Sequence, residues 1–188
     1  MVDSYLSYKK LKFKYLKFIK SQEILSEPFR DKIGQLNKFY LPLSKKIYKN
    51  FLKDKKTKII GLTGGQGSGK STISKILKIV LQEGFNMNTT IFSIDDFYKT
   101  FKERKKMSIK ISPLFLTRGV PGTHDTKLLT NCIKNLKSNN FKKTLIPKFD
   151  KSIDDRLPKK NWQKIKRKPD IVIFEGWCVG VTPQKKKI

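Results

Sequence analysis

The spacing of apolar residues along the chain predicts helices and a few buried strands. Apolar side chains recur every three or four residues in four stretches, which places them on one face of a helix. These stretches are residues 5–20, the segment after Pro42, residues 71–82 and residues 126–138. Three short runs rich in β-branched or other apolar residues instead predict strands at 58–63, 89–94 and 171–175. Strands that alternate with helices favour an α/β fold with a parallel sheet.

The two N-terminal helices each carry an apolar stripe that needs a partner. The first stripe consists of Tyr8, Leu11, Tyr15 and Phe18, and the second of Leu43, Ile47, Tyr48, Phe51 and Leu52. We therefore expect residues 1–56 to form a helical segment that packs on a core domain, residues 57–188. The alternative is a free helical hairpin that binds another protein.

Two other stretches show no sustained pattern. Residues 102–112 are basic and predict a loop or a frayed helix, and residues 144–158 contain two prolines and predict a loop. Between them, a turn that contains Gly119, Pro121 and Gly122 precedes the helix at 126–138, which either Thr123 or Asp125 can cap. Cys132 falls on the apolar face of that helix, so we expect it in the core.

A glycine-rich loop between the first predicted strand and the helix at 71–82 has the spacing of a phosphate-binding loop. Gly64 is followed after four residues by Gly69, Lys70 and Ser71, the pattern G-x-x-x-x-G-K-[ST]. Glycines allow many backbone N–H groups to face phosphate oxygens, and the helix directs its positive end at the anion. Lys70 is expected to reach the β- and γ-phosphates of ATP, and the Ser71 hydroxyl to bind Mg²⁺. A flexible glycine turn that matches by chance is the alternative. The predicted nucleotide-binding residues are Gly64, Gly65, Gln66, Gly67, Ser68, Gly69, Lys70, Ser71 and Thr72.

Acidic residues end two of the predicted strands. In a doubly wound parallel sheet, ligands bind beyond the carboxyl ends of the strands, so these acids are expected near the phosphate-binding loop. Asp95 and Asp96 would point to opposite sides of an extended backbone, and one of them could accept the proton of an attacking hydroxyl. The alternative for this pair is a helix cap. Glu175 suits the acid that orients the Mg²⁺ shell beside such a loop.

The net charge and the number of cysteines exclude some classes of function. The chain of 188 residues has 43 basic and 15 acidic residues and a net charge of +28. Only five of the basic residues are arginines and the lysines are spread along the chain, so we expect weak adhesion to polyanions and no specific nucleic-acid site. Two cysteines are too few for a disulfide scaffold, and no apolar run has the length of a membrane span. We therefore expect a cytoplasmic location and no membrane partner.

Several motifs together resemble a known kinase family. They follow the loop GGQGSGKST and are SIDDFY (93–98), RGVPGTHD (118–125), PKFDKS (147–152) and IVIFEGWCVG (171–180). In this order they resemble the plant-type D-glycerate 3-kinases and related fungal ATP-dependent kinases, which belong with uridine kinase, phosphoribulokinase and pantothenate kinase. The segment FYLPLSKKIYK (39–49) is also similar to the helix that precedes the first strand in this family.

The resemblance implies a three-layer P-loop fold, ATP and Mg²⁺ as cofactors, and roles for individual residues. Asp95 aligns with the general base, while Lys70 and Arg118 would assist transfer, and Ser71 and Glu175 would hold the metal. The acceptor pocket would be lined by Asp95, Tyr98, Arg118, His124 and Asp125, with Lys148 and Arg156 as further candidates. From the residues alone, His124 as a lone histidine near a cap is more typical of a structural role, and Arg118 is the better anion ligand.

The expected function is transfer of the γ-phosphoryl group of ATP to the hydroxyl of a small acceptor, above all D-glycerate. Alternatives are another small acceptor such as a nucleoside, an inactive nucleotide-binding module, or a polyanion binder. Relatives continue beyond the last predicted strand and carry a glycine-rich spacer where this chain reads DKSIDDR. We therefore expect a sheet of three strands with an open edge, and a P-loop fold that is incomplete at its C-terminus.

Overall fold

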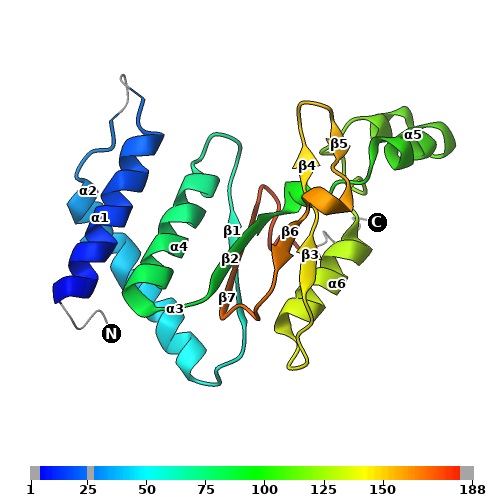
Figure 1. Cartoon of the computed structure of the whole chain (residues 1–188). Coiled ribbons are helices and arrows are strands. Elements are labelled where there is room, and N and C mark those ends of the chain that lie inside the picture. The colour runs from blue at the N-terminus through cyan, green and yellow to red at the C-terminus, as the bar shows by residue number, and fades with distance from the viewer. Residues whose placement is uncertain (1–4, 25–27, 183–188) are drawn as a thin grey trace. The chain divides into compact units, whose positions relative to one another are not determined.

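The computed structural model describes residues 5–24 and 28–182 (Figure 1). The chain forms two compact units. The first consists of residues up to Ile91 together with Pro169 onward, and the second of Phe92–Lys168. The second unit is thus an insertion between two strands of the sheet that belongs to the first.

The sheet of the first unit contains the three strands predicted from the sequence. They are β1 (Lys58–Thr63), β7 (Ile171–Gly176) and β2 (Thr89–Ser93), and β7 lies between the other two. Strands β1 and β7 are parallel, with Lys58 opposite Ile171 and Thr63 opposite Gly176. Every residue of β7 is buried, as expected for the middle strand of a sheet packed in a core.

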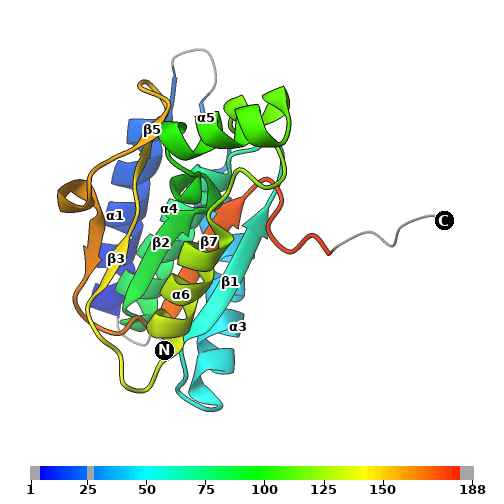
Figure 2. The same ribbon diagram turned by 90° about the vertical axis from the view of Figure 1, so that its right-hand side faces the viewer.

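Helices of the first unit pack against this sheet through one central helix. Helix α4 (Lys70–Phe85) contacts β1 and β7, and α1 (Tyr5–Gln22) and α3 (Leu41–Leu52) pack on α4. Figure 2 shows these three helices behind the strands of the sheet. A short helix α2 (Lys32–Gln35) and a π-helical turn (Leu36–Tyr40) join α1 to α3. None of the described helices combines the length and the apolar character needed to cross a lipid bilayer.

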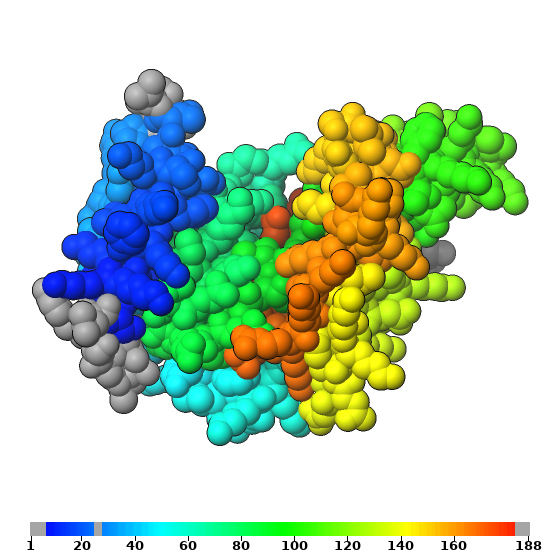
Figure 3. Space-filling model, in the orientation of Figure 1, coloured from blue at the N-terminus to red at the C-terminus, as the bar shows by residue number. Residues whose placement is uncertain are grey.

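Helix α1 is held by a stripe of fully buried side chains. Leu11, Tyr15 and Ile19 follow one another at intervals of four residues, and none of them is exposed. The Tyr15 hydroxyl also donates a hydrogen bond to the carbonyl oxygen of Lys32 at 2.9 Å. Helix α1 therefore lies against α4 and is not a free helical hairpin (Figure 3).

The stripe predicted for α3 is only partly correct. Ile47 is buried, and Tyr48 packs on Phe85 of α4 with ring centroids 5.2 Å apart. Leu43 and Leu52, however, are each close to half exposed. The inward positions of α3 also include a serine, Ser44, which is fully buried and which a search for apolar residues passes over.

The second unit contains two helices and two small antiparallel strand pairs. The helices are α5 (Phe101–Lys110) and α6 (Thr126–Lys137). Strand β3 (Thr144–Ile146) pairs with β6 (Gln163–Ile165), and β4 (Phe149–Asp150) pairs with β5 (Asp155–Arg156). Short 3-10 turns cover Ile94–Phe97, Pro113–Leu116 and Lys159–Asn161.

One prediction for this unit is wrong, and another is right only in its helical alternative. The supposed loop at 144–158 contains β3, β4 and β5, whose two or three residues are too few to show an alternating pattern. The basic stretch at 102–112 lies mostly in the regular helix α5. Thr100 and Glu103 begin that helix with a capping box, in which the Glu103 carboxylate accepts a hydrogen bond from the Thr100 N–H at 2.8 Å. The buried residue of α5 is Arg104 and not an apolar side chain, which is why the helical periodicity is weak.

Candidate functional site

The predicted phosphate-binding loop joins β1 to α4 in the first unit. Gly67 and Gly69 have φ angles of 74° and 78°, in the left-handed region that favours glycine. A Cβ atom added to Gly64 would lie 2.8 Å from the Ser68 hydroxyl oxygen, whereas one added to Gly65, Gly67 or Gly69 would meet no atom within 4 Å. The loop is therefore tightly folded at Gly64 and open along its other glycines. An anion needs this open space to reach the backbone N–H groups.

Lys70 and Ser71 occupy the first turn of α4. The Lys70 ammonium group reaches back across the loop and donates a hydrogen bond to the Gly65 carbonyl oxygen at 2.5 Å. The Ser71 hydroxyl donates to Oε1 of Glu175 in β7 at 3.2 Å, and the Glu175 side chain is nearly buried. The structure thus brings together Ser71 and Glu175, which lie far apart in the sequence. A hydroxyl and a carboxylate are the hard oxygen ligands that suit Mg²⁺, so these residues fit the metal that the loop type implies.

Asp95 and Asp96 lie in a 3-10 turn of the second unit and not in an extended strand. The hydroxyl of Ser93 accepts a hydrogen bond from the Asp95 N–H at 3.2 Å, and the Asp96 carboxylate accepts one from the Ser93 N–H at 3.3 Å. Our reasoning that the two acids point to opposite sides of a strand is therefore wrong. The turn begins at Ile94 because Ser93 and Asp96 form a capping box.

The two acids differ in their partners. Besides its cap, Asp96 forms an ion pair with Lys148 at 3.2 Å. Asp95 Oδ2 accepts a hydrogen bond from the Lys151 ammonium group at 2.8 Å. Asp95 Oδ1 is buried and has no hydrogen-bond partner in the described part of the chain. Asp95 therefore retains an acceptor atom for a further group, whereas Asp96 is used in the fold.

Tyr98 and His124 form a stacked pair near these acids. Their ring centroids lie 4.2 Å apart with an angle of 22° between the rings. Burial lowers the pKa of His124 below its ordinary value, and the negative charge of Asp95 offsets this only in part. Nε2 of His124 is buried without a hydrogen-bond partner among the described residues. Near neutral pH the imidazole is therefore neutral.

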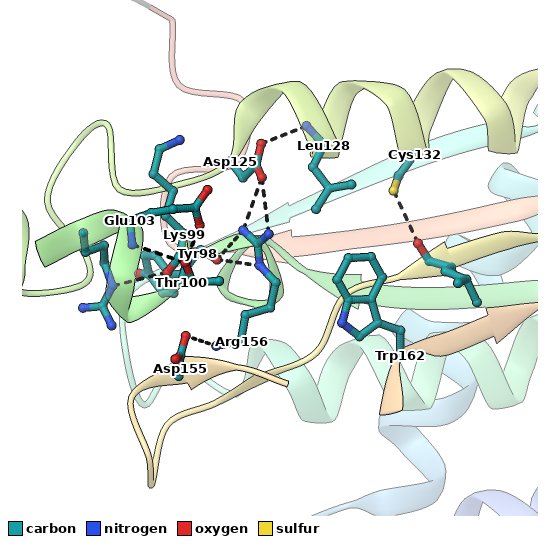
Figure 4. Close-up of polar contacts among 12 residues, drawn as sticks. Tyr98, Lys99, Thr100, Glu103, Asp125, Leu128, Cys132, Asp155, Arg156 and Trp162 are labelled. Atoms are coloured by element: carbon teal, nitrogen blue, oxygen red, sulfur yellow. Dashed lines mark hydrogen bonds and ion pairs between the residues drawn. The ribbon is translucent and has the colours of Figure 1, made fainter. Parts of the chain in front are cut away.

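Asp125 and Arg156 are engaged in the fold of the second unit (Figure 4). Asp125 caps α6 by accepting a hydrogen bond from the Leu128 N–H at 3.0 Å, which settles which residue begins that helix. Arg156 pairs with Asp125 at 3.3 Å and donates two hydrogen bonds to the carbonyl oxygen of Tyr98. These contacts tie β5, α6 and the segment after the 3-10 turn together. Whether Asp125 also meets an acceptor stays a prediction.

Cys132 lies in the core, as expected. Its thiol donates a weak hydrogen bond to the Leu145 carbonyl oxygen at 3.6 Å (Figure 4). Burial, with a smaller effect of the Asp125 charge, raises the pKa of the Cys132 thiol to about 11. The thiol is therefore protonated at neutral pH and is not a nucleophile.

Arg118 has partners that the sequence did not suggest. Its guanidinium group pairs with Asp154, which also accepts a hydrogen bond from Arg104. Lys151 was likewise missed, although it lies inside the PKFDKS motif. The apolar residues around Arg118, Asp154 and Lys151 do not recur with a helical or strand period. The signals in the sequence that could have identified these residues are the motifs in which they lie and the rarity of arginine in this chain.

Comparison with known proteins decides the family. Residues 59–184 match the model of the "Phosphoribulokinase / Uridine kinase family". The chain belongs to this family. The match to the phosphoribulokinase/uridine kinase family includes all of the predicted nucleotide, metal and acceptor residues, from Gly64 to Glu175. The resemblance to P-loop kinases stated from the motifs is thereby confirmed.

The curated relatives include fungal and plant kinases. The chain is 38% identical over 132 residues to "Uncharacterized kinase mug58" of Schizosaccharomyces pombe, which covers 66% of this chain and 47% of that protein. It is 40% identical over 136 residues to "Probable ATP-dependent kinase TDA10" of Saccharomyces cerevisiae, covering 66% of this chain and 46% of that protein. Identity to the chloroplastic D-glycerate 3-kinase of Arabidopsis thaliana is 29% over 133 residues, with 66% and 29% covered. The chain spans about half the length of the two fungal relatives.

A solved relative shows that the fold is shared. The D-glycerate 3-kinase of Cryptococcus neoformans superposes with a TM-score of 0.68 at 29% sequence identity, covering 77% of this chain and 53% of that one. The α/β fold with a parallel sheet and N-terminal helices therefore follows the architecture of P-loop kinases.

Proposed function

We propose that the protein is an ATP-dependent kinase that transfers the γ-phosphoryl group of ATP to a hydroxyl group of a small acceptor. The observation that carries this proposal is the Ser71–Glu175 hydrogen bond behind an open glycine loop, with Lys70 on the same turn. A glycine turn that matched the motif by chance would have no reason to place a nearly buried carboxylate against this serine.

On the nucleotide side, the loop and the first turn of α4 meet the phosphates. Backbone N–H groups and the Lys70 ammonium group bind the oxygens, and Ser71 and Glu175 would hold Mg²⁺. When bound, that ion neutralises charge on the β- and γ-phosphates. Lys70 gives up its hydrogen bond to the Gly65 carbonyl oxygen when phosphate takes its place.

On the acceptor side, Asp95 is the group that takes the proton of the attacking hydroxyl. Its Oδ1 atom has no hydrogen-bond partner among the described residues and can accept that proton, while its Oδ2 atom is held by the Lys151 ammonium group. His124 is neutral and presents Nε2 as a further contact for a polar acceptor, with Tyr98 stacked behind it. Arg118 is the anion ligand in this group.

D-Glycerate is our proposed acceptor, because two relatives carry the name D-glycerate 3-kinase and because Arg118 suits a carboxylate. Relatives named pantothenate kinase and putative uridine kinase favour other small acceptors as the second candidate. A cytoplasmic location is part of the proposal.

Steady-state transfer from Mg-ATP to D-glycerate, uridine and pantothenate, followed as ADP release, tests the proposal. We expect transfer to D-glycerate, and we expect Lys70→Ala to abolish it and to weaken Mg-ATP binding in a calorimetric titration. Lys75→Ala changes an exposed lysine of the same helix and is the matched control. Nucleotide binding without transfer to any acceptor would identify an inactive nucleotide-binding module instead.

A further inference from the structure

Arg104 is a fully buried arginine in a chain whose cations are mostly surface lysines. From α5 its guanidinium group donates hydrogen bonds to three separate segments of the second unit. Nε donates to the Lys99 carbonyl oxygen at 3.3 Å and Nη1 to the Leu116 carbonyl oxygen at 2.7 Å. Nη2 donates to Asp154, at 2.5 Å to its carbonyl oxygen and at 2.9 Å to its Oδ2. A buried charge is costly unless it is paired and hydrogen-bonded, so this arrangement depends on all of these partners.

Asp154 is the residue that Arg104 holds. It lies in the turn between β4 and β5 and has a φ angle of 52°, which is strained for a residue with a side chain. Its other oxygen, Oδ1, accepts a hydrogen bond from Nη1 of Arg118. Although partial burial alone would raise it, the hydrogen bonds from Arg104 and Arg118 hold the pKa of Asp154 below its usual range. One carboxylate thus stands between two arginines, and the group carries a net positive charge.

Arg118 is the open member of this group. Its side chain is 34% exposed, whereas that of Arg104 is not exposed at all. A guanidinium group has five N–H donors, and within the described residues Arg118 engages one of them, the bond to Asp154. Both arginines also lie on the ring of Phe149, at 5.8 Å for Arg104 and 6.0 Å for Arg118. The orientation of Arg118 is therefore fixed by a carboxylate and an aromatic ring while most of its donors stay available.

The Phe149 ring connects this group to the proposed acceptor residues. Its centroid lies 5.3 Å from that of Tyr98, which stacks on His124. A Cβ atom on Gly119, the residue after Arg118, would lie 3.9 Å from the Tyr98 hydroxyl oxygen. Arg118 therefore belongs to the same cluster as the residues to which we assign acceptor binding.

We propose that Arg104 is a positioning residue, which fixes Asp154 and through it directs the available N–H donors of Arg118 at a carboxylate group of the acceptor. This inference rests on the proposed function for the identity of the site and its ligand, and adds the residues that orient Arg118 toward that ligand. A planar carboxylate matches two parallel N–H donors of one guanidinium group. A lysine in place of Arg104 would carry the same charge but would lack the planar set of N–H donors with which the guanidinium group reaches three segments.

Equilibrium binding of D-glycerate to the full chain, compared with glycerol as its uncharged analogue, tests the inference. We expect Arg118→Ala to weaken D-glycerate binding by about 100-fold, as for loss of a charge-assisted pair, and to leave glycerol binding unchanged. Arg118→Lys keeps the charge and should recover part of the affinity. Arg104→Met touches no ligand but should weaken D-glycerate binding by about tenfold, with Mg-ATP affinity unchanged. Lys105→Met, an exposed neighbour in α5, is the matched control.

A second variant is needed if circular dichroism shows that Arg104→Met does not fold. Asp154→Asn keeps the shape of the side chain and removes the charge between the arginines, and it should also lower D-glycerate affinity and not glycerol affinity. Wild-type affinity in both folded variants would overturn the inference, as would a wild-type chain that does not bind D-glycerate. If that chain still phosphorylated uridine, the kinase would stand and the carboxylate site would be rejected. Binding of D-glycerate that depends on Arg104, without any transfer, would support the site and reject the kinase.

Discussion

Asp95 and Asp96 show how far neighbouring side chains of one type can differ. Asp96 closes a capping box with Ser93 and pairs with Lys148, so its carboxylate is used by the fold. Asp95 has one oxygen on Lys151 and the other without a partner among the described residues. The turn places them in different environments although the sequence gives no sign which is which.

This difference predicts opposite effects of the same substitution. Asp95→Asn should remove phosphoryl transfer and leave Mg-ATP affinity nearly unchanged, because a base acts in the transition state and not in nucleotide binding. Asp96→Asn should lower the free energy of unfolding by about 1 kcal/mol, the usual effect of a weakened cap, and retain measurable transfer. Turnover and urea denaturation of the two variants, each compared with the wild type, check this. An inactive Asp96→Asn beside an active Asp95→Asn would reverse our assignment of the base.

Some residues of the candidate site could be predicted from sequence motifs, and others could not. Lys70, Ser71 and Glu175 were found because loop spacing and strand ends carry that chemistry in the sequence, and the structure places Ser71 against Glu175. Arg104 and Asp154 were not found, because a buried ion pair between α5 and a tight turn leaves no periodic pattern. The side on which each acid points was also wrong, since a local cap replaced the extended backbone.

At the scale of elements, one acid on α4 holds α1 in place by charge as well as by apolar packing. Glu83 forms ion pairs with Lys10 at 3.1 Å and with Lys14 at 2.6 Å. Although burial alone would raise it, the hydrogen bonds from these lysines leave the pKa of Glu83 below its ordinary 4.5. The ionised form of Glu83 therefore stabilises the packing of α1 on α4.

We expect Glu83→Gln to lower the free energy of unfolding by about 0.5–1 kcal/mol at neutral pH, the range of exposed ion pairs. A carboxyl group whose pKa is lowered in the folded state contributes its full stabilisation above the unfolded pKa, near 4.5, and loses it as the pH falls through the folded value. The difference between wild type and variant should therefore shrink below about pH 4.5. Denaturant titrations at several pH values measure it, with Lys17→Gln on α1 as control. A difference that stays constant into acid would show that packing and not charge is responsible.

Long elements were predictable and short ones were not. The helices α1, α4 and α6 carry repeated apolar positions over several turns, and the three strands of the sheet are short runs of β-branched and other apolar residues. The strands within 144–165 have only two or three residues each, too few for an alternating pattern, and α5 buries Arg104 where a stripe of apolar residues would be expected. Burial of Ser44 and exposure of Leu43 in α3 show the same limit inside a correctly predicted helix.

At the scale of the whole molecule, a net charge of +28 opposes folding by self-repulsion. Screening by salt reduces this repulsion over distances of about 10 Å at 0.1 M ionic strength. We expect the melting temperature to rise between low salt and about 0.3 M NaCl, the opposite of what loss of the Glu83 pairs alone would give. Thermal denaturation followed by circular dichroism measures this, with an uncharged osmolyte as control. A melting temperature that falls with salt would mean that specific ion pairs outweigh the general repulsion.

The same charge predicts adhesion to polyanions without specificity. Binding to single-stranded and double-stranded nucleic acid should be similar and should fall steeply with salt concentration, because lysines act through released counterions. Fluorescence anisotropy with oligonucleotides of unrelated sequence checks this. A strong preference for one sequence that persists at high salt would instead favour a nucleic-acid-binding function.

The order of the sheet, with β7 between β1 and β2, has a consequence for how the chain is made. On a ribosome, β1 and β2 leave the exit tunnel long before β7, yet in the described sheet each of them neighbours β7 and not the other. At that stage α1 and α4 have been synthesised with their apolar faces, but β7, the middle strand of the sheet on which α4 packs, has not. Nascent chains that stop before Ile171 should therefore hold exposed apolar surface and engage chaperones, and release of Ile171–Gly176 should end that engagement. The time that translation takes across the inserted second unit, and not the stability of the finished protein, then sets how long the first unit is open to aggregation.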